Sequence, residues 1–134
     1  MCVLLMFGCG AERREHRVAQ RTMPAEPSSE IFAIGSELTP QGAVTAESSN
    51  DSFRRGPELF LSIDVSSAST DQTIAVHWTD DQGVIKRIDR RVVTRDERYA
   101  PFSSGPTHRW RAGKHRAVIV IDGRRVSEKE FGLI

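Results

Sequence analysis

Apolar and polar residues alternate with a period of two through much of the chain beyond residue 58. Residues 59–65 read LFLSIDV and residues 74–79 read IAVHWT, so that in each run every second residue is a large aliphatic or aromatic one. This period is that of a β-strand with one buried face. Residues 80–83, DDQG, then predict a turn, and residues 84–92 predict the return strand.

The predicted return strand has two unlike faces. One face carries Ile88 and Val92, and the other shows Arg87, Asp89, Arg91 and Arg95. On the strand before it, His77 is expected on the face opposite Trp78, because neighbouring residues of a strand point to opposite sides.

The last part of the chain predicts a β-hairpin. Residues 115–121 read HRAVIVI, Asp122-Gly123 follows, and residues 124–134 alternate loosely through Val126 and Phe131. Asp-Gly between two strands is typical of a type I′ turn, in which both central residues need positive φ. The unbroken apolar run 117–121 predicts a strand near the middle of a sheet, with both faces covered.

The remaining segments are shorter or less regular. Runs 31–34 and 43–46 predict edge strands, whereas residues 96–109 predict a long loop. Within residues 31–134 no long segment carries apolar residues at the three-to-four spacing of a helix. We therefore predict an all-β fold, an antiparallel two-sheet sandwich of six to eight strands over residues 31–134.

A set of residues near the C-terminus resembles the closing hairpin of immunoglobulin-like sandwiches, which are common in bacterial envelope proteins. The residues that carry the resemblance are Trp110, Gly113, His115, Val118, Val120, Asp122 and Gly123, with His115 standing where tyrosine is usual. Residues 58–78 are similar to the second and third strands of that fold, with Trp78 as the core tryptophan. The resemblance implies an immunoglobulin-like sandwich and says little about function.

Charge is unevenly distributed along the 134 residues, although the formal net charge is only +1. Residues 31–83 hold 2 basic and 8 acidic side chains, and residues 84–125 hold 12 basic and 4 acidic ones. The small net charge argues against a general affinity for nucleic acid or for an anionic membrane. Opposite charges on neighbouring strands would neutralise each other across the sheet.

The basic segment supplies the candidate binding residues. Arg87, Arg91 and Arg95 are expected on one strand face, near a second group on the next strand; the full candidate set is Arg87, Arg91, Arg95, Arg109, Arg111, Lys114 and Arg116. If the two groups converge, they form a cationic surface for an acidic protein or an envelope polyanion such as a lipopolysaccharide phosphate. The alternative is a solvated face neutralised by the acidic strands.

The first thirty residues differ from the rest of the chain. Residues 3–7 are apolar, and Gly8-Cys9 then leads into a strongly polar stretch with Pro24 and Pro27. The step resembles the end of a bacterial lipoprotein signal peptide, which implies a lipid on Cys9, a signal segment 1–9 and a flexible tether 10–30. Gly10 after the cysteine implies the outer membrane, on its periplasmic face. A secretory signal, or a cytosolic protein with a disordered N-terminus, are the alternatives.

Residues that could support catalysis or cofactor binding do not gather in recognisable motifs. The two cysteines lie at positions 2 and 9, so the predicted sandwich holds no disulfide. The histidines lack zinc-ligand spacing, and His108 and His115 are expected to be surface or half-buried groups. The chain has no phosphate-cradling glycine loop, dinucleotide fingerprint or nucleophile elbow. We therefore expect no enzyme, no metal and no cofactor.

These observations favour a non-enzymatic envelope lipoprotein whose sandwich acts as a binding or assembly module. The second hypothesis is a soluble cytosolic accessory or inhibitor domain. An enzyme of unrecognised type, the third, would need a deep pocket with convergent polar groups.

Overall fold

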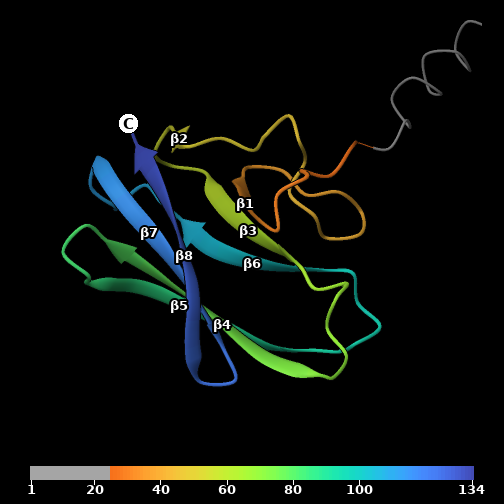
Figure 1. Ribbon diagram of the computed structural model, residues 1–134. Helices are drawn as coiled ribbons and strands as arrows, with labels where there is room; N and C mark the ends of the chain where they lie inside the picture. The colour runs from red at the N-terminus through yellow and green to blue at the C-terminus, as the bar shows by residue number, and fades with distance from the viewer. Residues whose placement is uncertain (1–24) are drawn as a thin grey trace, which may run out of the picture.

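A computed structural model describes residues 25–134, and this part of the chain folds into eight β-strands (Figure 1). The strands are β1 (Phe32–Gly35), β2 (Ser52–Phe53), β3 (Glu58–Asp64), β4 (Gln72–Asp80), β5 (Ile85–Val93), β6 (Tyr99–Pro106), β7 (Gly113–Ile121) and β8 (Arg124–Leu133). The described residues contain no helix.

The strands form two sheets packed face to face. One sheet has three strands in the order β1-β3-β6, and the other has five in the order β2-β8-β7-β4-β5. All pairings are antiparallel except that of the short β2 with β8. This arrangement is an immunoglobulin-like sandwich, which confirms the predicted fold class. The β7–β8 hairpin also turns as predicted, with positive φ at Asp122 (50°) and Gly123 (80°).

The core lies between the two sheets. Trp78 is fully buried at its centre, 6.4 Å from the Trp110 ring and 5.8 Å from the Phe131 ring, measured between ring centroids. Leu61 and Phe102 pack from the three-stranded sheet. The alternation of residues 59–65 and 74–79 therefore identified the inward side chains correctly.

The segment 96–109, predicted to be a loop, contains strand β6, so that prediction was wrong. Ala100 and Phe102 of β6 are buried in the core, but prolines, serines and a glycine dilute the strand pattern around them. Pro101 is tolerated because β6 is the edge strand, and the Pro101 nitrogen lies on the side away from β3.

The first described residues cover the outside of the three-stranded sheet. Residues 32–35 form the predicted edge strand, whereas 43–46 form only isolated bridges through Val44 and Thr45. The backbone N–H of Val44 donates to the Ser62 hydroxyl at 2.8 Å on that outer side. Gly35 lies under the same loop, where a β-carbon would meet Val44 and Ser48 at 2.5 Å. The close approach therefore requires glycine.

A bulge in β5 decides which way its side chains point. Trp78 pairs with Arg87 but the next residue, Thr79, pairs with Ile85, which leaves Lys86 as an extra residue. One extra residue exchanges the two faces of the strand beyond it. Beyond the bulge, Arg87, Asp89 and Arg91 consequently share the side of the sheet that buries Trp78, and Ile88 and Val92 point away from it.

Candidate functional site

The charged face of β5 is directed across the open side of the sandwich toward β6. Arg87 donates from Nε to the Ser103 carbonyl oxygen at 3.2 Å, and the Ser103 backbone N–H donates to Asp89 Oδ2 at 2.7 Å. Arg91 pairs with Glu97, with 2.8 Å between Nη2 and Oε2. We call these contacts the β5–β6 seam. Arg87 and Arg91 share one strand face as predicted, and in this structure both contact the chain itself.

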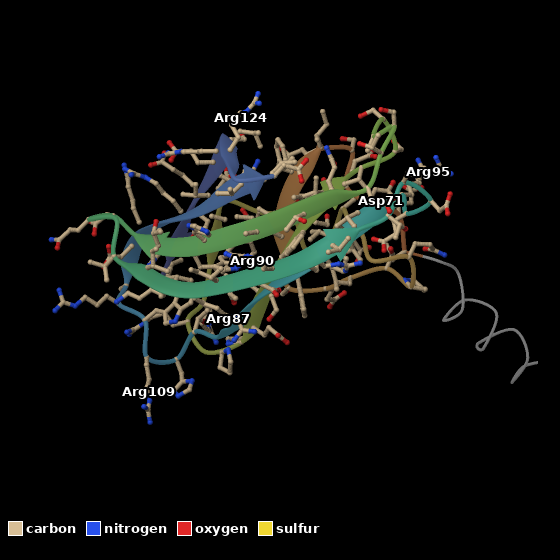
Figure 2. All side chains as sticks on the ribbon, turned by 90° about the horizontal axis from the view of Figure 1, so that it is seen from below. Asp71, Arg87, Arg90, Arg95, Arg109 and Arg124 are labelled. Carbon is tan, nitrogen blue, oxygen red and sulfur yellow. The ribbon has the colours of Figure 1, made fainter. Side chains whose placement is uncertain are left out.

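The other predicted basic residues are distributed over the molecule, not gathered in one patch. Arg95 follows the end of β5, and Arg109 lies in the loop before β7, at the opposite end of the sandwich (Figure 2). Arg116 lies on the outer face of the five-stranded sheet, with its Nε 3.7 Å from Glu130. Partner binding is not tested by this geometry, so the candidate set stays a prediction.

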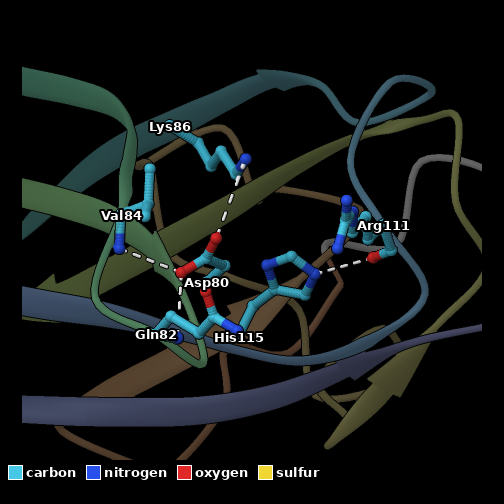
Figure 3. A network of polar contacts seen from close by, with 6 residues as sticks. All are labelled: Asp80, Gln82, Val84, Lys86, Arg111 and His115. Atoms are coloured by element: carbon cyan, nitrogen blue, oxygen red, sulfur yellow. Dashed lines mark hydrogen bonds and ion pairs between the residues drawn. The ribbon is translucent and has the colours of Figure 1, made fainter.

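Arg111 and Lys114 are the predicted residues that the fold does bring together. They line a depression of about 180 Å³ at the end of β4 and the start of β7. Lys86 of β5 also lines it, and Figure 3 shows Lys86 and Arg111 with Asp80 and His115. The side chains of Asp80, Asp81 and Gln82 from the β4–β5 turn complete the polar rim. We call this cluster the basic end of the sandwich. Lys86 was missed because its bulge position is not visible in the sequence.

Asp80 organises the turn beside this depression. Its Oδ1 accepts hydrogen bonds at 2.9 Å from the backbone N–H groups of Gln82 and Val84, and Lys86 Nζ lies 3.8 Å from its Oδ2. The Val84 N–H bond is the largest influence on the pKa of Asp80, which lies below its ordinary value of 3.8, with a smaller opposing effect of desolvation. Asp80 is therefore a turn residue, as its position in DDQG indicated.

His115 is buried, which corrects the expectation of a surface or half-buried group. Its ring is 1% exposed and lies between Trp110 and Phe131, at 5.6 and 5.7 Å between centroids. Nε2 lies 2.8 Å from the Arg111 carbonyl oxygen, so Nε2 carries a proton, and Nδ1 has no partner among the described residues. The sequence held a hint of this, because His115 stands where the resembling hairpins usually carry a tyrosine, and aromatic side chains are often buried.

The charge asymmetry along the chain is not removed by direct pairing. Of the five ion pairs among residues 25–134, only Lys86–Asp80 joins the acidic segment 31–83 to the basic segment 84–125. Direct neutralisation between the two segments is therefore limited to one contact.

Other candidate chemistry is limited in the described part of the chain. Among residues 25–134 no three His, Cys, Asp or Glu side chains are placed to hold a metal ion. The same residues include no helix long and apolar enough to cross a membrane. Cys9, the predicted lipidation site, and the segments 1–9 and 10–24 lie outside the described residues, whereas Ser28 and Glu30 contact Val44 and Lys129 of the sandwich.

The chain matches no protein-family model and no curated protein sequence. Among solved structures it is similar to an immunoglobulin-like protein of Pseudomonas aeruginosa, at 13% identity and a TM-score of 0.43, over 81% of this chain and 95% of that one. It is also similar to part of the alkylpurine DNA glycosylase AlkC of Pseudomonas fluorescens, solved bound to DNA containing an abasic site analog. That match has 11% identity and a TM-score of 0.38, and covers 77% of this chain but only 30% of the glycosylase. Likeness at this level describes the arrangement of strands and assigns no function.

Proposed function

We propose that this protein is a non-enzymatic binding module of the bacterial cell envelope, held to a membrane by a lipid on Cys9. Its ligand is an acidic protein or a phosphate-bearing envelope polyanion, and the basic end of the sandwich is the contact surface. The observation that carries the proposal is the convergence of Lys86, Arg111 and Lys114 on one depression.

The charges around the depression favour an anion. Three cationic side chains face two carboxylates, those of Asp80 and Asp81, which leaves an excess of one positive charge. The Asp80 carboxylate already accepts two backbone hydrogen bonds, so its repulsion of an incoming anion is partly offset. Arg111 and Lys114 are exposed, and neither forms an ion pair with another described residue. Such side chains are available for charge-assisted hydrogen bonds to phosphate or carboxylate oxygens.

The anchor is tested by intact mass and membrane flotation of the natively expressed full chain beside a Cys9→Ser variant. We expect the unsubstituted chain to carry a lipid-sized mass increase and to float with membranes, and Cys9→Ser to do neither. If both chains are soluble and unmodified, the anchor is wrong, and the alternative of a soluble cytosolic accessory or inhibitor domain takes its place.

The basic end is tested on the soluble Cys9→Ser chain with purified lipopolysaccharide as the probe. The Arg111→Gln/Lys114→Gln double variant should weaken binding about tenfold or more, because each charge-assisted hydrogen bond to the probe contributes about 1.5–3 kcal/mol. The matched control is Arg98→Gln/Arg124→Gln, which removes the same charge from exposed positions outside the candidate set, just before β6 and at the start of β8. Equal weakening in both double variants would mean that net charge alone attracts the probe, and the proposed site would be wrong.

A further inference from the structure

The outer face of the five-stranded sheet carries an apolar strip that residues 25–134 leave uncovered. On β5, Ile85, Ile88 and Val92 are 50%, 46% and 63% exposed. Val118 and Val120 of β7, which are half-buried, add to this apolar surface. The small Ala75 lies on the same face of β4 but is only 5% exposed. An antiparallel sheet that faces water normally carries polar residues there, so this group of exposed apolar residues, interrupted by His77 and Arg90, indicates a contact surface.

The strand registers arrange this face in four rows that cross the sheet from β5 to β8. The first row holds Ile85, Thr79, Arg116 and Glu130, and the second holds Ile88, His77, Val118 and Glu128. The third row holds Arg90, Ala75, Val120 and Arg125, and the fourth holds Val92 and Thr73. Along the strand direction, successive rows are about 6.6 Å apart.

The rows are complementary to themselves under one two-fold rotation. We propose that a second copy of this chain packs its own outer face on this one, about a two-fold axis that runs across the strands between the second and third rows. This axis places each second row over the partner's third row. Val118 then lies on Val120 of the other copy, and the large His77 side chain lies on the small Ala75.

The same rotation pairs the charges and the ends of the strip. Glu128 lies over Arg125 of the other copy, and the symmetry repeats this pair, so the β8 side of the interface holds two opposite-charge pairs. Within one chain Arg125 Nη2 and Glu128 Oε2 are already 2.6 Å apart, so the four groups form one alternating network. At the β5 side, Ile85 of the first row lies over Val92 of the partner's fourth row. The aliphatic part of Arg90 covers Ile88.

The area of the outer face sets the expected affinity of the dimer. Four strands about 4.8 Å apart and about nine residues of about 3.3 Å each give a footprint of about 600 Å² per copy. A standard stable interface buries about 800 Å² per partner, so we expect a reversible dimer of micromolar affinity. This face is distinct from the basic end, and the dimer does not depend on the lipid anchor.

Sedimentation velocity of the full chain with Cys2→Ser and Cys9→Ser tests the proposal, because these changes remove the anchor and any disulfide cross-link. Between about 1 µM and 1 mM the protein should pass from the monomer mass to twice that mass. Val118→Lys, which places a charge at the centre of the face, should weaken association by about 100-fold or more. Arg125→Glu and Glu128→Arg should each weaken it about tenfold, since each brings like charges together in both symmetric contacts.

A mixing experiment distinguishes the proposed pairing from a general loss of folding. The Arg125→Glu chain and the Glu128→Arg chain, each weak alone, should associate with one another, because the mixed pair restores opposite charges in both contacts. Ile31→Lys, at an apolar residue that is 62% exposed outside this face, is the matched control and should leave the dimer unchanged. A chain that stays monomeric at the highest concentration, or a dimer that survives Val118→Lys, would overturn the proposal.

Discussion

The two faces of β5 carry opposite chemistry, and each is turned the opposite way from what a sandwich strand usually shows. The face toward the other sheet carries Arg87, Asp89 and Arg91, and the face toward solvent carries Ile88 and Val92 with Arg90 between them. In β4, the neighbouring strand, Trp78 points inward and His77 outward, as in most half-buried strands. An edge strand can therefore use its charged face to close the open side of a sandwich.

The closure works through the backbone of β6. β6 lies at the edge of its sheet, so its outward N–H and C=O groups have no neighbouring strand. At Ser103 both groups are bound by β5 side chains, the N–H by Asp89 and the carbonyl by Arg87. Inward-pointing charged residues are a known protection of sheet edges against unwanted strand pairing. The charged face of β5 therefore has a structural use that does not require a partner.

Deleting Lys86 should have the largest effect on this arrangement. Without the extra residue, the side chains of Arg87 and Asp89 would turn to solvent, and the backbone groups of Ser103 would be left without either partner. We expect the free energy of unfolding to fall by about 2–6 kcal/mol, since two backbone groups lose their partners and each unsatisfied partly buried group costs about 1–3 kcal/mol. Urea denaturation of the deletion variant measures the loss.

Lys86→Ala is the control for the deletion, because it keeps the residue count and removes only the contact with Asp80, whose two side chains are 30% and 19% exposed. A solvent-accessible pair at 3.8 Å contributes about 0.5 kcal/mol or less. If the deletion is no more harmful than Lys86→Ala, the turn at 80–84 has absorbed the missing residue, and the bulge does not set the faces of β5.

The same bulge explains how much of the fold the sequence could predict. The alternation of residues 59–65 and 74–79, and the Asp122-Gly123 turn, depend on local preferences, and the structure confirms them. Which face of β5 points inward depends on one extra residue opposite Trp78 and Thr79, and no local preference reveals it. β6 was hidden for a related reason, because its strand state comes from pairing with β3 and its own composition is that of a loop.

Asp89→Ala tests the charged face one hydrogen bond at a time. It removes the acceptor for the Ser103 N–H in a half-buried position, and we expect a loss of about 2 kcal/mol in the free energy of unfolding. Arg90→Ala, on the opposite face of the same strand, should change stability by less than about 0.5 kcal/mol in dilute protein. Equal effects at the two positions in denaturant titrations would show that the two faces do not differ in structural importance.

The candidate site was predictable only where its residues are close in sequence. Arg111 and Lys114 flank the start of one strand, so their proximity follows from the chain itself. Asp80 lies near them because β4 pairs with β7, with Asp80 opposite His115. Lys86 lies near them because it is the extra residue of the β5 bulge. Arg109 and Arg95 belonged to the same predicted group but lie at opposite ends of the sandwich (Figure 2). The separation of two residues in the sequence does not show at which end of the sandwich each of them lies.

The Arg91–Glu97 ion pair of the β5–β6 seam is expected to contribute less to the free energy of unfolding than the Asp89 hydrogen bond. The two side chains are 35% and 30% exposed, so solvent screens their attraction. A double-mutant cycle with Arg91→Ala and Glu97→Ala should give a coupling of about 0.5 kcal/mol, reduced further at high salt. A coupling that is large and independent of salt would contradict this, since it would mean that the seam shields the pair from water.

Asp80, in the turn that precedes β5, is expected to make the smallest contribution to the stability of the fold. That contribution depends on pH. The pKa of Asp80 is lowered in the folded chain, chiefly because its carboxylate accepts the Val84 N–H, so the ionised group contributes stability above its ordinary pKa of 3.8. That contribution is lost as the pH falls through the lowered folded-state pKa.

Asp80→Asn should therefore be less stable than the unsubstituted chain at neutral pH, and thermal melts of the two should converge as the pH drops below about 3.8. Asp81→Asn, an exposed change in the same turn, is the control and should be as stable as the unsubstituted chain at neutral pH. A difference between Asp80→Asn and the unsubstituted chain that persists in acid would mean that the turn is held by the shape of the side chain and not by its charge.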